Sequence, residues 1–357
     1  MLHQHRSVSP AEVVVEQHPD KGSRVSTASM LPIMEAITAY QKTAALVAAV
    51  KLDLFTLLGP GVATSEELSR KTQAAPRGVR ILCDSLCVME LLEKRDVGYS
   101  LTPASRLFLD NSSPAAMGSI VDFLAAPEMI SLFLDDPVSY VRRGGSVGLA
   151  NVAPDNPIWT RFAKSMVPLA SPTAKRVASY VATLPNRPYT VLDIAAGHGL
   201  YGIEVAKSLP EAFVTALDWT EVLAVARANA EKAGVHRRYR TLAGNLFEVD
   251  WGKDFDIILL PNILHHFDEE GCIALLRKAK ASLAIGGRAL VIDFVPNPDR
   301  VSPPIPAMFS LFMLATTPSG DAYVVSELEQ MAKAAGFRSA MARALLPTPQ
   351  TLIALEC

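Results

Sequence analysis

The sequence is poor in cysteine and has no surplus of either charge. It has 357 residues with only four cysteines, and 34 Lys and Arg residues nearly balance 36 Asp and Glu residues, for a net charge of −2. Four cysteines cannot staple a chain of this length with disulfides, so we expect reduced thiols and a cytoplasmic protein. The absence of a basic excess argues against a general nucleic-acid-binding protein.

Long apolar runs are absent as well. No segment reaches the roughly 18 uninterrupted apolar residues of a membrane span, and the most apolar stretch, residues 31–58, is interrupted by charges such as Glu35 and Lys51. The N-terminus lacks the apolar core of a secretory signal. Its three histidines lack regular metal-ligand spacing. We therefore expect no membrane segment and no bound metal.

Half of the residues are apolar, enough for a sizeable core, and the length suggests two domains. A proline-rich break, Pro185-Asn186-Arg187-Pro188, separates two kinds of pattern. We expect a loose polar tail over residues 1–28, a winged-helix domain over 29–115, a helical linker over 116–184 and a different architecture over 185–357.

The pattern of residues 29–115 is typical of a winged helix. Apolar residues at helical spacing follow Ser29, Thr64 and Glu67 form a capping-box pattern, and a helix over Val79–Leu92 precedes a short hairpin. Such a domain can read DNA, but this helix offers Arg77 and Arg80 beside acids, a poor set for base edges. The apolar helices instead favour pairing with a second copy.

From residue 189 onward, strands and helices alternate. Strands are expected at 190–194, 213–217, 239–242, 255–260 and, after a Gly-Gly turn, 288–294, with helices between them. This series predicts a mostly parallel sheet covered by helices on both faces. The last two strands, 339–345 and 351–356, are joined by a short proline-containing turn, which predicts an antiparallel hairpin at the edge of the sheet.

A glycine-rich loop follows the first of these strands. Gly197, Gly199 and Gly202 spell G-x-G-x-x-G, and Asp218 ends the next strand. This spacing matches a dinucleotide fingerprint, so a nicotinamide oxidoreductase is one interpretation. However, Asp193 places an anion beside the loop, which disfavours a pyrophosphate, and the closing hairpin is foreign to that fold. A ligand with a positive centre and no phosphate, such as S-adenosylmethionine, suits these features.

Several motifs in order carry a family resemblance: VLDIAAGHG (191–199), Asp218 in ALDW, GNLFE (244–248), NILHHFDEEGC (262–272), GGRALVIDFV (286–295) and AKAAGF (332–337). Over roughly residues 30–357 the chain resembles class I S-adenosylmethionine-dependent methyltransferases. More narrowly, it resembles small-molecule O-methyltransferases of the caffeate, acetylserotonin and hydroxyneurosporene type. The resemblance implies an α/β fold with a Rossmann-like seven-stranded sheet and closing antiparallel hairpin, preceded by a winged-helix dimerisation domain.

The same resemblance implies a cofactor site made of Asp193, Gly197, Gly199, Asp218, Trp219, Asn245, Leu246 and Phe247. The two glycines would let the backbone approach the methionine part of the cofactor. Asp218 would accept the ribose hydroxyls. Trp219 would pack on the adenosine or belong to the core, and Asn245 to Phe247 would flank the adenine. The family usually has Asp in place of Asn245, and an amide oxygen can still accept a hydrogen bond from the adenine amine.

His265 falls where these O-methyltransferases carry their general base, and Asp293 falls where an acid orients that base. Two positions depart from the family pattern, because Ala322 replaces a second acid and Pro261 replaces a frequent Lys or Arg. A structural or substrate-orienting role for His265 therefore stays open. We expect His266 to pack outward.

The acceptor pocket should be apolar, and its candidate residues are Phe162, Met166, Met308, Phe312 and Met313. Taken together, these features predict a homodimeric O-methyltransferase that methylates a small, aromatic or polyketide-like secondary metabolite with the help of a base. Alternatives are C- or N-methylation by proximity, a nicotinamide oxidoreductase, and a winged-helix regulator that senses a ligand. We expect no nucleic-acid or membrane partner.

Overall fold

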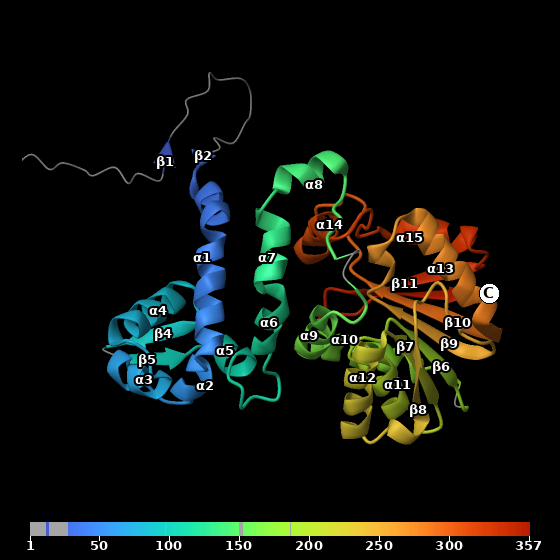
Figure 1. The fold of residues 1–357 in the computed structure, drawn as a ribbon, viewed down its shortest axis with the longest axis horizontal. Helices are drawn as coiled ribbons and strands as arrows, with labels where there is room; N and C mark the ends of the chain where they lie inside the picture. The colour runs from blue at the N-terminus through green and yellow to red at the C-terminus, as the bar shows by residue number, and fades with distance from the viewer. Residues whose placement is uncertain (1–11, 14–27, 97, 150–152, 186) are drawn as a thin grey trace, which may run out of the picture. The chain divides into compact units, whose positions relative to one another are not determined.

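A computed structural model describes residues 12–13, 28–96, 98–149, 153–185 and 187–357 (Figure 1). The chain divides into two compact units, an N-terminal unit that ends at Gly118 and a C-terminal unit that begins at Ser119. The predicted tail, residues 1–28, lies outside the described residues except for β1 (Glu12–Val13) and the first residue of β2 (Ala28–Ser29), which pair antiparallel. The three N-terminal histidines fall outside as well.

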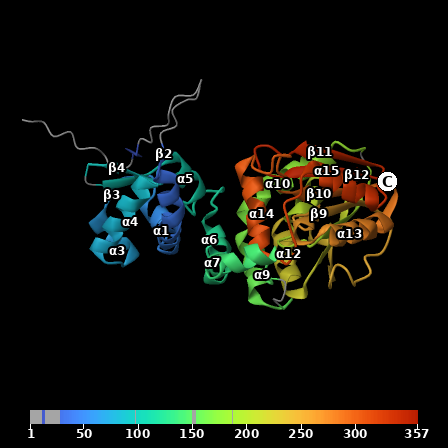
Figure 2. The same cartoon turned by 90° about the horizontal axis from the view of Figure 1, so that it is seen from above.

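The N-terminal unit is a winged helix. Its elements are α1 (Leu31–Lys51), α2 (Leu54–Leu58), β3 (Ala63–Thr64), α3 (Ser65–Thr72), α4 (Pro76–Val88), β4 (Leu92–Arg95), β5 (Gly98–Leu101) and α5 (Pro103–Phe108). The three strands form a sheet in the order β3-β5-β4. Strands β3 and β4 lie beside α3 and α4 (Figure 2). The predicted capping box is present, since the Thr64 hydroxyl accepts from the Glu67 amide at 3.2 Å and the Glu67 carboxylate accepts from the Thr64 amide at 2.8 Å.

Two details of this unit differ from the sequence prediction or refine it. Helix α4 ends at Val88, and Leu92, predicted as helical, is the first residue of β4. Arg80, one of the two possible DNA-reading side chains of α4, forms an ion pair with Asp84 at 3.0 Å, and Asp84 also binds Lys94 at 2.7 Å. Asp84 therefore neutralises part of the charge that a groove-reading helix needs.

Helix α1 has an unusual surface. Ala49 is its only residue classed as buried, and large apolar side chains along its first half are exposed, including Leu31, Ile33, Ile37 and Tyr40. A single copy of the winged helix therefore leaves much of this helix uncovered.

The C-terminal unit begins with helices and continues with a seven-stranded sheet. The helices before the sheet are α6 (Val121–Leu124), α7 (Pro127–Leu134), α8 (Pro137–Arg143), α9 (Pro157–Ser165) and α10 (Val167–Val181). The strands are β6 (Thr190–Ile194), β7 (Phe213–Asp218), β8 (Tyr239–Ala243), β9 (Phe255–Pro261), β10 (Leu283–Asp293), β11 (Ser339–Ala344) and β12 (Thr351–Glu356). They follow the order β11-β12-β10-β9-β6-β7-β8, parallel except for β12, which pairs antiparallel with both β10 and β11.

Helices cover both faces of this sheet. Neighbouring residues of a strand point to opposite sides, so each strand contributes side chains to the core on either face. The helices that alternate with the strands are α11 (Leu200–Ser208), α12 (Thr220–Lys232), α13 (Glu269–Ser282), α14 (Pro304–Thr316) and α15 (Val325–Ala334). Val191 belongs to one core with residues of α10, α11 and α12, and Leu192 belongs to another with residues of α13 and α15. The parallel order brings the carboxyl ends of β6, β7 and β9 together at one edge.

Strand β10 corrects one predicted boundary. It begins at Leu283, so Gly286 and Gly287 lie within the strand rather than in a turn before it. The pairing of β10 with β9 shifts register between Leu283 and Arg288. A Cβ at Gly287 would lie 2.8 Å from the carbonyl oxygen of Phe255, so the irregular stretch depends on close backbone contact. In the described part of the chain, no helix combines the length and apolar character needed to cross a bilayer.

Candidate active site

A cavity of about 400 Å³ opens at the carboxyl edge of the sheet in the C-terminal unit, where α/β proteins bind ligands. Most of the wall comes from the strand ends and the loops and helices that follow them: Ala195–His198, Tyr201, Leu217–Trp219, Val222, Gly244, Leu246, Pro261–Ile263, His266 and Phe267. The rest of the wall comes from Leu149, Trp159, Phe162 and Thr316–Pro318.

Two predicted glycines shape the loop between β6 and α11 for different reasons. Gly197 lines the cavity with φ +56°, and a Cβ there would meet only the Ala195 carbonyl oxygen at 3.9 Å, so it serves the left-handed turn. Gly199 has φ +77°, and its Cβ would lie 2.4 Å from Tyr239 Oη and 2.9 Å from the Ala226 Cβ. Gly199 therefore lets α11 begin against neighbouring elements, and it is not among the residues that line the cavity, so its predicted approach to the cofactor stays a prediction.

Asp218 ends β7 and faces the cavity. Its Oδ2 accepts a hydrogen bond from the Gly197 amide at 2.8 Å, and its Oδ1 accepts one from the Trp219 amide at 2.7 Å. Desolvation raises the pKa of Asp218 to about 6, although both amides favour the charged form. Each carboxylate oxygen has a further lone pair, so two hydroxyl groups could donate to Asp218 from the cavity.

Asp193 lies beneath the loop and is fully buried rather than part of the cavity wall. Its Oδ2 accepts from the Gly202 amide at 2.9 Å, and its Oδ1 has no hydrogen-bond partner among the described residues. Burial raises the pKa of Asp193 to about 8. Asp193 therefore acts on a ligand only through the loop that it supports.

The three residues predicted to flank adenine separate in the structure. Leu246 lines the cavity together with Gly244. Asn245 instead folds the loop, since its Oδ1 accepts from the Phe247 amide at 3.0 Å and its Nδ2 donates to Glu248 at 3.1 Å. Phe247 is 42% exposed and packs edge-to-face on Phe267, with ring centroids 5.0 Å apart.

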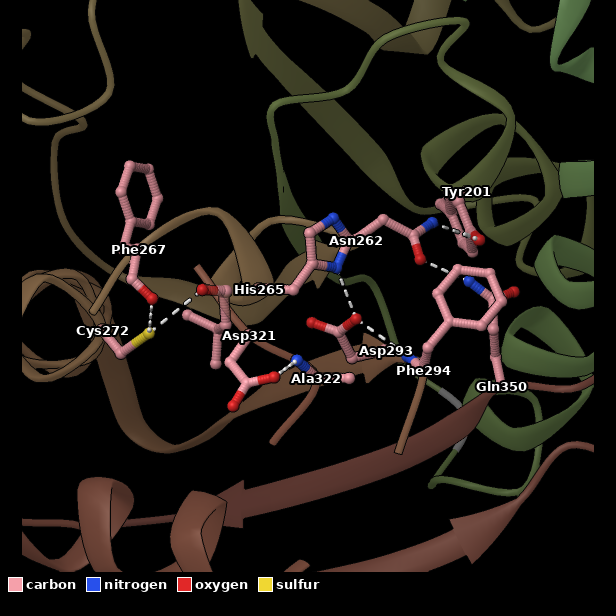
Figure 3. A network of polar contacts seen from close by, with 11 residues as sticks. Tyr201, Asn262, His265, Phe267, Cys272, Asp293, Phe294, Asp321, Ala322 and Gln350 are labelled. Carbon is pink, nitrogen blue, oxygen red and sulfur yellow. Dashed lines mark hydrogen bonds and ion pairs between the residues drawn. The ribbon is translucent and has the colours of Figure 1, made fainter. Parts of the chain in front are cut away.

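His265 and Asp293 form a buried pair (Figure 3). His265 Nδ1 lies 2.6 Å from Asp293 Oδ1, which also accepts the Phe294 amide at 2.8 Å. A carboxylate on Nδ1 holds the proton of a neutral imidazole on that nitrogen, so Nε2 keeps its lone pair. The two side chains are paired as the sequence predicted, although neither is among the residues that line the cavity, and their role as an oriented base stays a prediction.

Two side chains outside the turn Leu264–His266, which carries this histidine, hold it by hydrogen bonds to backbone carbonyl groups. Cys272 Sγ donates to the Leu264 carbonyl at 3.1 Å, and Tyr323 Oη donates to the Phe267 carbonyl at 2.6 Å. Asp321, next to Ala322, does not replace the missing second acid, because its carboxylate binds the Ala322 amide at 2.8 Å and Arg300 at 3.3 Å.

Four residues of the cavity wall were missed or misplaced by the sequence interpretation. His266 lines the cavity and does not pack outward, and burial lowers its pKa to about 3. His198, which stands between Gly197 and Gly199, also lines the cavity, and burial lowers its pKa to about 4. Tyr201 accepts from Asn262 Nδ2 at 3.2 Å, and Asn262 Oδ1 accepts from Gln350 (Figure 3). The last contact joins the closing hairpin to the site, which no local motif reveals.

The predicted acceptor residues differ in where they lie relative to the cavity. Phe162 lines the cavity and packs edge-to-face on Phe123 at 5.0 Å. Met166 and Phe312 pack beside it in the same apolar cluster without lining the cavity. Met313 is buried to 1% exposure, whereas Met308 is 63% exposed and points away from the cluster. Helix α14 therefore turns Met308 outward, because it stands five residues before Met313 on a helix of 3.6 residues per turn.

The chemistry of the wall fits S-adenosylmethionine better than a dinucleotide. Among the described residues that line the cavity there is no Lys or Arg to meet a pyrophosphate. Asp218 offers the acceptors that ribose hydroxyls need. In the described part of the chain, no group of three His, Cys, Asp or Glu side chains is arranged to hold a metal ion.

Comparisons with known proteins now decide the family. A family model of the O-methyltransferase domain matches residues 144–338, and a model of the O-methyltransferase dimerisation domain matches residues 34–111. The chain belongs to the O-methyltransferase family. It is similar to the crystal structure of a protein from Nostoc punctiforme named as an O-methyltransferase, at 44% identity over 92% of this chain and 99% of that one, with a TM-score of 0.87.

Two further proteins are similar to this chain, and the structure of one of them is a complex with S-adenosylmethionine. The chain is 26% identical to the 3-hydroxy-5-methyl-1-naphthoate 3-O-methyltransferase of Streptomyces sahachiroi, over 80% of this chain and 83% of that protein. Its fold is similar to that of human N-acetylserotonin methyltransferase in complex with S-adenosylmethionine, with a TM-score of 0.78 and 20% identity over 91% and 96% of the two chains.

These findings confirm the predicted fold class and the O-methyltransferase activity. They do not favour the nicotinamide oxidoreductase or the ligand-sensing regulator. The family match over residues 34–111 also gives the winged helix a family role in dimerisation.

Proposed function

We propose that this O-methyltransferase methylates the hydroxyl group of a small, flat aromatic or polyketide-like metabolite, with His265 as the general base. The observation that carries the proposal is the 2.6 Å contact between His265 Nδ1 and Asp293, which leaves Nε2 as the basic nitrogen. An imidazole held in this way is suited to remove a phenolic proton as the oxygen attacks. Amine or carbon acceptors have less need of such a pair.

The cofactor, when bound, supplies a methyl group on a positively charged sulfur. Asp218 would accept its two ribose hydroxyls, Trp219 and Leu246 would contact the adenosine, and Gly197 would pass close to the methionine part. His265 Nε2 would accept the proton of the acceptor hydroxyl, and the oxygen of that hydroxyl would take the methyl group in place of the cofactor's sulfur. Asp293 stabilises the imidazolium that forms.

The acceptor class is proposed from the wall of the cavity. Phe162, Trp159 and Leu149 offer apolar surface opposite the strand ends, which suits a flat ring more than a charged or extended molecule. The Streptomyces relative is named for a hydroxylated naphthoate, an acceptor of this kind. Met166 and Phe312 support this wall from behind.

The domain roles follow the same division. Residues 29–115 would pair two copies, residues 116–184 would contribute the aromatic wall through α9, and residues 185–357 would hold the cofactor. The exposed apolar face of α1 supports a homodimer. The cytoplasmic location expected from the cysteine content stays a prediction.

The test is methyl transfer from labelled S-adenosylmethionine to a panel of phenols, anilines and electron-rich carbon acceptors, with product structure determined by mass spectrometry. We expect O-methylated phenols, and we expect His265→Ala to lower kcat by about 10²–10⁴. Asp293→Asn should lower kcat less, because it disturbs orientation without removing the base. Products methylated on nitrogen or carbon, or an alanine variant that retains more than about a tenth of the rate, would favour transfer by proximity alone.

A further inference from the structure

Lys278 binds the loop that forms one wall of the cofactor cavity, although Lys278 itself lies outside the cavity. It projects from α13, and its Nζ donates to the carbonyl oxygens of Leu246 at 2.8 Å, Phe247 at 3.0 Å and Val249 at 2.8 Å. An ammonium group has three protons, so the three contacts with this loop use the whole hydrogen-bonding capacity of Lys278. The half-buried side chain is thus committed to three backbone atoms of a single segment.

The segment is tied to the cavity at its first end, and its other end folds back onto Leu246. The Gly244 amide donates to the carbonyl of Asp218 at 3.1 Å, and both residues line the cavity. Trp251 Nε1 donates to the Leu246 carbonyl at 2.9 Å, so this oxygen receives two hydrogen bonds. Lys278 Nζ also lies 5.0 Å from the centre of the Trp251 ring, close enough for a cation–π contact.

The geometry of the loop suits a cation at this point. The amides of Glu248 and Val249 bind the Asn245 carbonyl, which makes residues 245–249 a single helical turn. Three carbonyl groups of this region converge on Lys278. Without its positive charge their oxygens would repel one another, and the carbonyls of Phe247 and Val249 would lose the donor that Lys278 supplies. The other side of the same loop presents Leu246 to the cavity.

We propose that Lys278 is a positioning residue for the base of the nucleoside, holding Leu246 and Gly244 where the adenine binds. The proposal rests on the proposed function, since it needs the cofactor to occupy this cavity. The ammonium group of Lys278 acts as a fixed internal cation. Its loss would let the turn of residues 245–249 move away from the adenine. His265 and Asp293 lie on other segments of the chain, so their contact should be unchanged when Lys278 is replaced.

Lys280 provides a matched control, because it lies two residues further along α13 and also donates to a backbone carbonyl, that of Gly336 after α15. We would measure the binding of S-adenosylhomocysteine to wild type, Lys278→Met and Lys280→Met by calorimetry, with thermal unfolding of each. We expect Lys278→Met to weaken binding about 10- to 100-fold, and Lys280→Met to change it less than about threefold. Trp251→Phe, which removes the other donor to Leu246, should weaken binding in the same direction by a smaller factor.

A second ligand shows which part of the cofactor is affected. Wild type should discriminate between S-adenosylhomocysteine and its inosine analogue, which lacks the purine amine, and Lys278→Met should lose most of that discrimination. Equal affinities of the two lysine variants, or an unchanged preference for adenine, would overturn the positioning role even if Lys278→Met unfolds more easily. Absence of binding by the wild type would instead reject the proposed function of the cavity and, with it, this inference.

Discussion

At the scale of single residues, the site contains carboxyl groups that are buried with few hydrogen-bond donors around them, so burial raises their pKa values. Asp218 is the clearest case, because desolvation raises its pKa to about 6 while the same carboxylate is proposed to accept two ribose hydroxyls. The charged form is the better acceptor. Binding of the nucleoside should therefore depend on the protonation of Asp218 in a range close to neutral pH.

We predict that affinity for S-adenosylhomocysteine is highest above pH 7 and falls as the pH decreases through about 6. The sign follows from the raised pKa, since below it Asp218 carries a proton and loses acceptor capacity. Titration calorimetry between pH 5 and 8 measures the effect. Asp218→Asn should bind more weakly at high pH, by about 1–3 kcal/mol, and should remove most of the pH dependence. An equally steep profile in the variant would assign the dependence to another group.

Sequence reasoning located the charged residues of the site better than the apolar ones. Asp218, His265 and Asp293 follow strands whose ends meet at one edge, so the βαβ pattern alone places them together. Met308 could not be placed in this way, because helical spacing does not say which face of α14 meets the protein. Lys278 gave no signal at all, since its three partners are backbone atoms about 30 residues away along the chain.

At the scale of elements, the strands were predicted closely because most are buried on both faces and bounded by turn residues. Strand β6 begins and ends where expected, at Thr190 and Ile194. The glycine loop that follows was predicted as well, but the reason for Gly199 was not. Its constraint comes from Tyr239 and Ala226, which approach it only after α12 and β8 have packed.

We predict that Gly199→Ala destabilises the fold by about 2–4 kcal/mol, the sum of a left-handed backbone cost and overpacking against Tyr239 and Ala226. Gly234→Ala is the matched control. Gly234 has φ +72°, close to the +77° of Gly199, but a Cβ there would meet nothing within 4 Å. The control should therefore lose only about 1 kcal/mol. Chemical denaturation of both variants measures the difference, and equal losses would show that Tyr239 moves aside without cost.

At the scale of the whole molecule, the two units depend on their surroundings to different degrees. The C-terminal unit has two large buried cores, one on each face of the sheet. The N-terminal unit has a smaller core, and α1 contributes only Ala49 as a fully buried residue. Exposed apolar side chains of this number on one helix are typical of a surface that another chain covers.

We predict that the enzyme is a two-fold homodimer paired through the N-terminal unit, burying at least about 2,000 Å² in total, as expected of an obligate interface. Light scattering at micromolar concentration should give twice the 38.4 kDa of one chain. Ile33→Glu combined with Ile37→Glu should shift the mass toward one chain, because two carboxylates would lose their hydration in the interface. Ile285→Glu, at a fully exposed position of β10, should leave the dimer intact. A wild-type monomer would reject this pairing, and so would tight, salt-sensitive binding of duplex DNA through the same unit.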